Sequence, residues 1–393
     1  MSPEQLQAQI RAIAPQIVAW RRHLHMHPEP SFQEFETMEF VSSVLGTYGI
    51  PHQKEVAGTG VVAYIAATHH DPQTPCLGLR ADLDALPILE QNEVPYKSQV
   101  AGWMHACGHD VHTSILLGAA VVIQANRESL KRPVKLIFQP GEEQNPGGAS
   151  LMIKAGVLEN PFVEELVALH VYPEMQVGQV GLKEGLYMAS SDEIHVEIEG
   201  VGGHGALPER FVNPIDVGIA WMQAARQLVE DQCPKEVPQV LTFGRFEALG
   251  STNVVTANAV IKGTFRTMNE QWRAAAKSIL KETAARVSAA YGATIEVKIG
   301  EGYPFLQNDH ELTHKVKNIL EKELGTSNVS ELGLRMTAED FAFYSHHRPV
   351  CFFRLGTSKP DQKTAPAVHH PQFDIDENAL EVGVKCLVAI ALS

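Results

Sequence analysis

The chain has 393 residues, of which 44% are hydrophobic and 20% are charged, and its formal net charge is -14 at pH 7. This length exceeds what one hydrophobic core usually supports, so we expect about two or three domains. The acidic balance argues against nucleic acid and anionic membranes as partners, because both require clustered Lys and Arg. The sequence contains no apolar stretch long enough to cross a bilayer.

The cysteines and the first residues indicate a cellular compartment. The five cysteines are odd in number and lack the spacing of a disulfide framework, which favours a reducing environment. The N-terminal residues lack the basic and apolar regions of a secretory signal. We therefore expect a cytoplasmic protein. Four cysteines stand among apolar residues, whereas Cys107 does not.

The first half of the chain alternates strand-like and helix-like segments. Apolar runs predict the strands, and the 3.6-residue periodicity predicts the helices. In chain order these are strands at Thr59–Ala67 and Cys76–Asp82, a helix at Val111–Ala125, a strand at Val134–Gln139, a helix at Ala149–Ala155 and a strand at Leu166–Val171. Such alternation predicts an α/β fold with a mixed, mostly parallel sheet covered by helices.

Polar residues stand at the ends of three of these predicted strands. Asp82 ends one strand, Glu142 and Glu143 follow another, and His170 ends a third. Ligands of open parallel sheets bind beyond the carboxyl ends of the strands. We therefore expect these four side chains at one rim of the sheet.

A different pattern begins near Gly185. It predicts a strand at Ser191–Gly200, a helix at Asn213–Glu230, strands at Gln239–Glu247 and Asn258–Thr267, a helix at Glu270–Tyr291 and a strand at Thr294–Ile299. This order is typical of an α+β, ferredoxin-like domain, which we expect to be inserted at residues 186–299. Residues 1–185 and 300–393 then form the main domain, which also includes a helix at His310–Leu324, a strand at Val350–Leu355 and a helix from Asn378.

Cys107 and His109 are two residues apart, between a predicted strand and a predicted helix. A thiolate and an imidazole are both good ligands for a transition metal. The alternative is a buried cysteine beside polar groups that cap a helix.

The adjacent carboxylates Glu142 and Glu143 follow a buried strand, where neighbouring side chains diverge. One of them could bind a metal while the other acts as a general base, as metal-assisted hydrolysis requires. The alternative for these two glutamates is a solvated acidic turn. The alternative for His170 is a core histidine whose hydrogen bonds are made within the protein.

Several ordered motifs resemble one protein family. Arg80–Pro87, His105–Asp110, Gln139–Glu143 and Ala338–Phe341 are similar to successive signatures of the M20 peptidase family. The branch they resemble contains hippurate hydrolases, N-acyl-amino-acid amidohydrolases and auxin-conjugate hydrolases. The likeness runs from the segment that begins at Arg21 to the segment that ends at Phe373, nearly the whole chain.

The resemblance implies a zinc-peptidase-like catalytic domain, an inserted lid and dimerisation domain, and two divalent metal ions per chain. Zinc or manganese is the first expectation, and cobalt or nickel would also suit the ligands. The residues that match the metal ligands are Cys107, His109, Glu143, His170 and His369, with Cys107 at a position where related branches have a bridging carboxylate. The family pattern His-x-Pro-x-Phe selects His369, although chemistry alone leaves His370 open.

The resemblance also assigns further roles. Glu142 matches the general base, and Asp82 would orient a ligand or tune the metals. His204 matches a lid histidine that reaches the active site of the partner subunit, where it could stabilise an oxyanion. Asn253 and Arg266 match lid positions that contact substrate, although a turn asparagine and an edge-strand arginine are also common structural features. A homodimer or higher homo-oligomer through the inserted domain follows from the same resemblance.

The expected reaction is hydrolysis of the amide bond of N-acyl amino acids or small N-capped peptides. The alternatives are a deacetylase of the N-acetyl-diaminopimelate type, a dipeptidase, or a metal-bearing binding protein without catalysis, which the intact Glu142–Glu143 pair disfavours. The chain departs from the commoner family pattern at Gly141, at Val111 and at Thr256-Ala257-Asn258. These departures concern specificity, because none of them removes a ligand or the base.

Overall fold

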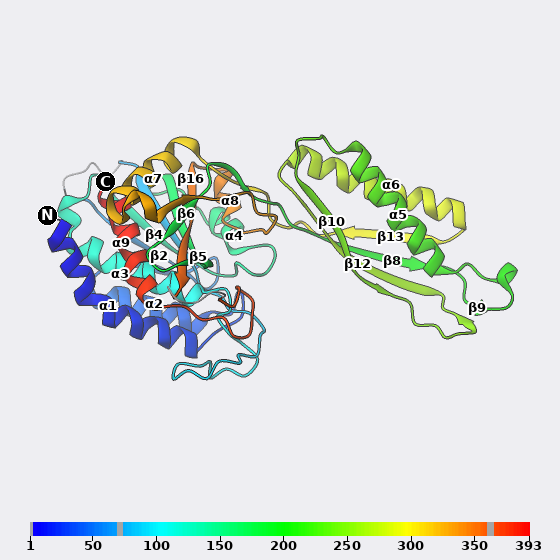
Figure 1. Ribbon diagram of the computed structural model, residues 1–393, viewed down its shortest axis with the longest axis horizontal. Coiled ribbons are helices and arrows are strands. Elements are labelled where there is room, and N and C mark those ends of the chain that lie inside the picture. The colour runs from blue at the N-terminus through cyan, green and yellow to red at the C-terminus, as the bar shows by residue number, and fades with distance from the viewer. Residues whose placement is uncertain (1–2, 69–73, 360–364) are drawn as a thin grey trace. The chain divides into compact units, whose positions relative to one another are not determined.

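The computed structural model describes residues 3–68, 74–359 and 365–393 (Figure 1). The chain forms two compact units, and each is described by itself. Unit 1 comprises Met1–Tyr187, Gln307–Leu334 and Phe343–Ser393, and unit 2 comprises Met188–Leu306 and Arg335–Ala342. Unit 2 thus includes a short segment, Arg335–Ala342, that follows the second part of unit 1 in the sequence.

Unit 1 is built on one sheet of eight strands. Their bounds are β1 His52–Val56, β2 Gly60–Ile65, β3 Cys76–Asp82, β4 Val134–Gln139, β5 Val163–Gln176, β6 Val180–Leu182, β15 Val329–Glu331 and β16 Val350–Ser358. The spatial order is β1-β2-β4-β3-β5-β16-β6-β15. The four central strands, β4, β3, β5 and β16, run parallel, whereas β1–β2, β2–β4 and β16–β6 are antiparallel. The predicted mixed, mostly parallel sheet is confirmed.

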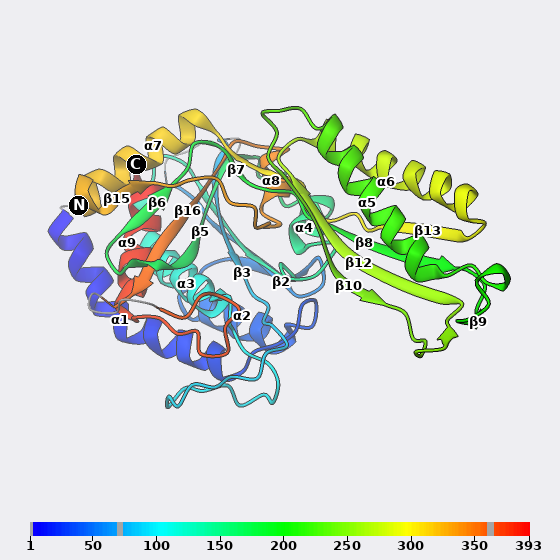
Figure 2. The same cartoon turned by 45° about the vertical axis from the view of Figure 1, so that its right-hand side comes forward.

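Helices enclose this sheet. Their bounds are α1 Pro3–Met26, α2 Phe35–Thr47, α3 His109–Ala125, α4 Gly148–Lys154, α7 His310–Leu324, α8 Ala342–Ser345 and α9 Asn378–Leu392. Short 3-10 turns of unit 1 lie at Arg127–Ser129 and Thr326–Asn328, and a third, Pro208–Arg210, belongs to unit 2. Helix α3 contacts both α1 and α9 (Figure 2). Gly118 permits this close packing, because a Cβ there would lie 2.6 Å from Ile17 of α1. No helix within the described ranges is long and apolar enough to span a bilayer.

The central strands are buried on both faces. Every residue of β3 and β4 is buried, as expected for parallel strands with helices on each side. The carboxyl ends of β3 and β4 lie in register, with Asp82 opposite Gln139. The residues that follow these two ends, Leu83 and Pro140, therefore start from the same edge of the sheet.

The prediction that His170 ends its strand is wrong. Strand β5 continues to Gln176, because its pairing with β16 extends to Gln176 opposite Ser358. Its pairing with β3, on the other side, stops at Ala168 opposite Arg80. His170 therefore lies just beyond the point where β5 loses one neighbour, which still places it at the edge where β3 ends.

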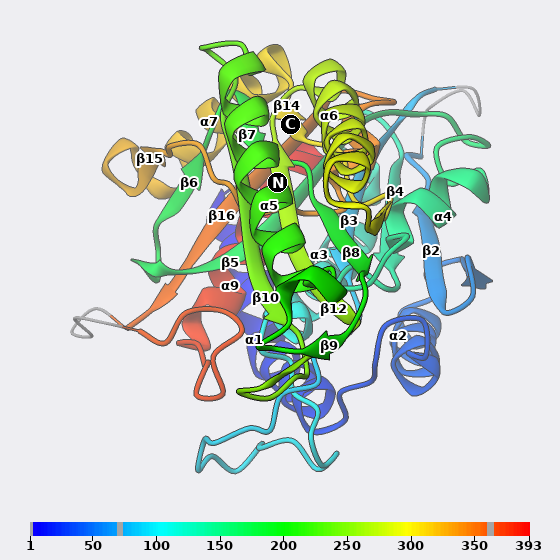
Figure 3. The same ribbon diagram turned by 90° about the vertical axis from the view of Figure 1, so that its right-hand side faces the viewer.

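Unit 2 contains a four-stranded antiparallel sheet. The strands are β8 Asp192–Glu199, β10 Gln239–Glu247, β12 Asn258–Thr267 and β13 Thr294–Ile299, and the helices are α5 Pro214–Gln232 and α6 Glu270–Tyr291. The spatial order β10-β12-β8-β13 is that of a split β-α-β sandwich. Figure 3 shows α5 and α6 side by side over one face of this sheet. The other face carries alternating polar residues, as in β8, where Glu193, Glu197 and Glu199 are exposed.

Local sequence signals start the helices of unit 2. Asn213 accepts a hydrogen bond from Ile215 N at the start of α5, and Pro214 occupies the first helical position. Asn269 caps α6 by accepting from Trp272 N at 2.8 Å. A second small sheet pairs β9 (Gly203–His204) with β11 (Val254–Val255), and β7 (Gly185–Met188) pairs with β14 (Leu306–Asn308).

Candidate metal centre

The turn into α3 places Cys107 and His109 at the edge of the sheet. Gly108, between them, has a φ of 81° and is the residue before the helix. A Cβ at Gly108 would lie 2.6 Å from Val171 of β5, so glycine is required both for this conformation and for the close contact with β5. His109 is the first residue of α3, two residues earlier than the predicted helix start.

Cys107 lies at the centre of two groups of ligand atoms. Its Sγ is 3.5 Å from His170 Nε2 and 3.3 Å from His369 Nε2. One group combines Cys107 with His109 and His170, and the other combines Cys107 with Glu143 and His369; the ligand atoms of each group lie within 4.8 Å of one another. Because both groups share the Cys107 sulfur, they are candidates for two adjacent cation sites with one common ligand atom.

The hydrogen bonds of two histidines direct their Nε2 atoms toward this centre. His109 Nδ1 donates to the main-chain oxygen of Asp84 at 2.9 Å and lies 3.1 Å from Asp84 Oδ1. His170 Nδ1 donates to the main-chain oxygen of Val171 at 2.8 Å. With Nδ1 used in this way, Nε2 is the atom left for a metal. Among the described residues, His109 Nε2 has no hydrogen-bond partner.

The carboxylates Glu142 and Glu143 follow β4 on a turn that begins at Gly141, whose φ is 57°. Glu143 Oε1 lies 3.3 Å from His369 Nε2, without a hydrogen bond of good geometry in the described part of the chain. Glu142 Oε2 lies 3.9 Å from His109 Nε2. The two neighbouring carboxylates thus face the same centre from two directions.

His369, and not His370, faces Cys107. The main chain of His369 has a φ of 66°, a conformation that non-glycine residues rarely adopt, and its N–H donates to Ala106 at 2.8 Å. His370 Nδ1 instead accepts a hydrogen bond from Gln372 N at 3.1 Å. The unusual backbone at His369 aims its ring at the cysteine.

Asp82 is fully buried behind the ligand atoms. Its carboxylate accepts hydrogen bonds from His112 Nδ1 at 2.6 Å and from Arg80 at 2.5 Å, and it lies 3.9 Å from His109 Nε2. His112 Nε2 accepts from Val171 N at 2.9 Å, so both ring nitrogens of His112 are already used. Asp82 therefore fixes neighbours of the ligands, and His112 is unsuited to be a ligand.

The electrostatic potential at this centre is negative. Burial and the neighbouring carboxylates Glu143 and Glu142 raise the pKa of Cys107 well above its usual range. Burial opposes a charge on His109, but Asp82 and Asp84 outweigh it and raise the pKa of His109 to about 10. In metal-free protein, protons on Cys107 and His109 compensate part of this negative potential. A divalent cation would compensate it instead and would displace those protons.

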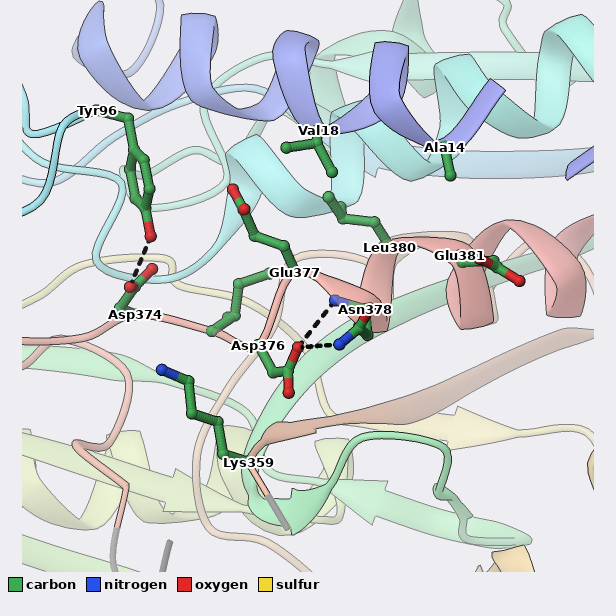
Figure 4. Close-up of a pocket in the computed structure, with 11 residues that line it drawn as sticks. Ala14, Val18, Tyr96, Lys359, Asp374, Asp376, Glu377, Asn378, Leu380 and Glu381 are labelled. Atoms are coloured by element: carbon green, nitrogen blue, oxygen red, sulfur yellow. Dashed lines mark hydrogen bonds between the residues drawn. The ribbon is translucent and has the colours of Figure 1, made fainter. Parts of the chain in front are cut away.

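A buried arginine connects the segments that carry His109 and His369. Arg21 donates to Asp110 at 2.8 Å and to Asp374 at 2.9 Å, and Asp374 also accepts from Tyr96 Oη at 2.9 Å (Figure 4). Asp110 directly follows His109, and Asp374 follows His369 in the loop before α9.

A cavity of about 410 Å³ is lined by Tyr96 and Asp374, between α1 and the start of α9. Its walls include Asp374, Asp376 and Glu377, which are drawn in Figure 4. Asp376 accepts from Asn378 N at 3.0 Å, and Glu377 pairs with Arg22 at 2.6 Å. These carboxylates have partners within the protein, and their contacts anchor the start of α9.

Comparison with known proteins identifies the family. A model of peptidase family M20/M25/M40 matches residues 78–393. The chain belongs to the M20 family. It is 38% identical to the N-acetyl-L-cysteine deacetylase of Bacillus subtilis (strain 168), over 94% of this chain and 86% of that protein. It is 36% identical to the IAA-amino acid hydrolase ILR1-like 4 of Arabidopsis thaliana, over 95% of this chain and 84% of that protein.

A solved structure of the M20 family has the same fold. It is the YXEP protein of Bacillus subtilis, described as a dinuclear metal binding peptidase, with a TM-score of 0.81 and 32% identity over 97% of this chain and 98% of that one. The resemblance to the M20 family predicted from the sequence motifs is confirmed.

The donor set of this M20 chain fits transition-metal ions. A thiolate, imidazoles and a carboxylate suit zinc, and imidazole with carboxylate also suits manganese, cobalt and nickel. Two buried atoms that could bind a metal, His109 Nε2 and Glu143 Oε1, have no hydrogen-bond partner in the described ranges. Buried polar atoms without partners are rare in native proteins, and a bound cation would satisfy both.

Three other predicted site residues belong to unit 2. His204 lies in β9, is exposed, and accepts from Ala206 N at 3.1 Å. Asn253 is exposed, and its main-chain oxygen accepts from Gly205 N at 2.9 Å. Arg266, in β12, forms no ion pair within the described part of the chain, and burial lowers its pKa. The roles of all three stay predictions.

Sequence reasoning missed several residues that hold the centre together. Asp84 is the main one, and it stands two residues after Asp82, so a second carboxylate in the same motif was the available signal. His112 lies on the same face of α3 as His109, three residues later, which is a helical spacing that could have been read. Glu34 accepts a hydrogen bond from Gly141 N at 2.7 Å, and this contact and that of Arg21 with Asp110 join residues too far apart in the sequence to give a local signal.

Proposed function

We propose that this M20 chain is a metal-dependent amidohydrolase that cleaves the amide bond of N-acyl amino acids or small N-capped peptides, releasing a carboxylic acid and a free amino acid. The observation that carries this proposal is the pair of ligand groups sharing Cys107, with the carboxylate of Glu142 3.9 Å from His109 Nε2. The deacetylase and amino-acid hydrolase relatives support the class of substrate.

Five residues would hold two divalent ions: Cys107, His109, Glu143, His170 and His369. When bound, the ions would activate water and polarise the amide carbonyl, which is the chemistry that hydrolysis requires. Glu142 acts on protons: its carboxylate takes one from the attacking water and returns it to the departing amine nitrogen. Asp82 keeps His112 and Arg80 in place behind the ligands.

The surface of unit 2 supports a dimer. Strand β10 is an edge of the four-stranded sheet, and its residue Phe246 is exposed, as are Ile215 and Ile219 of α5. An open edge beside exposed apolar residues is a surface that a second copy would cover. In such a dimer, His204 of the partner subunit would stabilise the oxyanion, and Asn253 and Arg266 would contact substrate.

Light scattering after size-exclusion chromatography tests the dimer. We expect the mass of two chains for the wild type and of one chain for Ile219→Glu, which places a charge on the proposed interface, with loss of most activity. A wild-type monomer with full activity would contradict both the dimer and the role of His204.

The five cysteines, all free, fit the cytoplasmic location that we propose.

The proposed reaction is tested by Glu142→Gln. This change keeps the shape of the side chain and removes its ability to take a proton, so kcat on N-acetyl and N-benzoyl amino acids should fall by at least about 100-fold. Bound metal, measured by elemental analysis, should stay at the wild-type level because Glu142 is not one of the five proposed ligands. Activity close to that of the wild type would remove Glu142 as the base.

A further inference from the structure

Two buried carboxylates hold the backbone of the Glu142–Glu143 turn. Glu34 Oε1 accepts a hydrogen bond from Gly141 N at 2.7 Å, and Asp84 Oδ2 accepts one from Glu143 N at 2.9 Å. Both carboxylates are buried. Glu142 thus stands between two backbone groups that are each fixed by a buried carboxyl side chain.

Each carboxylate has further partners that fix it in turn. Thr59 Oγ1 donates to Glu34, and Ser31 Oγ donates to Asp84 at 2.6 Å. Asp84 also lies 3.1 Å from His109 Nδ1, which donates toward its Oδ1. Asp84 therefore connects the backbone of Glu143 to the ring of His109, two of the proposed ligands.

The turn needs such external support. Gly141 has a φ of 57°, and a Cβ there would lie 2.2 Å from the ring of Phe32. Its carbonyl accepts from Gly148 N at 2.9 Å, so the main chain of Gly141 is held through both its N–H and its C=O. A glycine turn alone samples many conformations, whereas a general base must be held within about 0.5 Å of its productive position.

Glu34 is costly to bury as a carboxylate beside the others at this centre. Burial, and then the nearby Asp84, raise the pKa of Glu34 to about 7. Local arrangements that oppose stability are concentrated at functional sites. A purely structural brace could have used neutral acceptors, such as main-chain carbonyls or amide side chains.

We propose that Glu34 and Asp84 are positioning residues for the hydrolysis: they hold the turn so that Glu142 faces substrate while Glu143 faces the ligand group. This inference rests on the function proposed above. Neither residue touches substrate, so their contribution acts through the turn and through His109.

Kinetics of Glu34→Ala and Glu34→Gln test this inference. The alanine variant should lower kcat by about 10–100-fold with KM changed by less than about threefold, as for other residues that orient a catalytic group. The glutamine variant should retain most of kcat, because its amide oxygen still accepts from Gly141 N and Thr59 can accept from its amide nitrogen.

Glu29→Ala is the matched control. Glu29 lies in the same segment, and its carboxylate accepts two hydrogen bonds from main-chain groups of α2, from Glu36 N at 3.1 Å and from Thr37 N at 2.8 Å. Its loss should lower the melting temperature without lowering kcat. A kcat for Glu34→Ala that matches that of Glu29→Ala would show that Glu34 supports only the fold and would overturn the inference.

Two readouts do not depend on activity. Hydrogen exchange of peptides covering residues 138–148, followed by mass spectrometry, should be faster in Glu34→Ala and unchanged in Glu29→Ala. Titration of metal-free protein with Mn²⁺ or Zn²⁺ should show about 10–100-fold weaker binding for Asp84→Asn. If the wild type cleaves no amide, the proposed function fails, and these two readouts still decide whether the carboxylates position the turn. Unchanged exchange in Glu34→Ala and unchanged affinity in Asp84→Asn would refute it.

Discussion

Each unit of the protein contains a buried arginine that joins two or more acidic side chains. In unit 1, Arg21 donates to Asp110 at 2.8 Å and to Asp374 at 2.9 Å. In unit 2, Arg273 donates to both oxygens of Asp192, at 2.7 and 2.8 Å, and to Glu270 at 2.9 Å. The two networks use the same chemistry at similar burial.

The two arginines differ in what they connect. Arg21 joins α1 to the residues that follow His109 and His369 in the sequence, so it supports the candidate metal centre. Arg273 joins α6 to β8 and to Gly302, whose carbonyl accepts from it at 2.9 Å. A buried ion pair is therefore not by itself a mark of function, and its connections decide which property depends on it.

Arg21→Met gives the largest expected effect. Removing one member of a buried ion network leaves the other charges without a partner and typically costs about 3–5 kcal/mol of folding free energy. Because Asp110 and Asp374 lose their common partner, His109 and His369 should lose their alignment. Urea unfolding should shift by this amount, and bound metal and kcat should fall together.

Arg273→Met is the control for that prediction. Its loss of stability should be similar, since Asp192 is equally buried. Bound metal should remain at the wild-type level, because no proposed ligand lies in unit 2. Equal metal loss in both variants would mean that the metal content follows global stability, and the distinction between the two networks would fail.

The strands of unit 1 illustrate what the sequence could predict. The apolar runs predicted the observed bounds of β3 and β4, since a strand buried on both faces is mostly hydrophobic. The predicted starts of α5 and α6, at Asn213 and Glu270, fall within one residue of the observed ones, because the signal that begins a helix is local. The end of β5 was missed, because it depends on pairing with β16, which lies far away in the sequence.

The candidate site divides in the same way. Residue types that suit metal ligands occur in short motifs, and the structure brings Cys107, His109 and Glu143 together with two distant histidines. Their roles stay predictions. Two of the residues that hold them were not predictable: Glu34 reaches Gly141 across 107 positions, and Arg21 reaches Asp110 across 89. Periodicity and local motifs contain no information on such contacts.

Glu165→Gln gives the smallest expected effect and extends the comparison to a partly exposed ion pair. Glu165, in β5, accepts hydrogen bonds from Arg132 and from Lys315, the latter at 3.1 Å, and its side chain is 15% exposed. Burial opposes its charge, but these partners prevail and lower the pKa of Glu165. At pH 7 the variant should lose about 0.5–1 kcal/mol, far less than the Arg21 and Arg273 variants, because water screens the pair.

The pH dependence of that loss separates charge from shape. A carboxyl group whose pKa is lower in the folded state stabilises the fold above its unfolded pKa, and this contribution disappears as the pH falls through the folded value. The stability difference between wild type and Glu165→Gln should therefore shrink as urea unfolding is repeated from pH 7 toward pH values below the ordinary glutamate pKa. A stability difference that stays constant across this range would mean that the substitution acts through packing and not through charge. The larger stability losses expected for the Arg21 and Arg273 variants would then reflect their deeper burial rather than the loss of a charge.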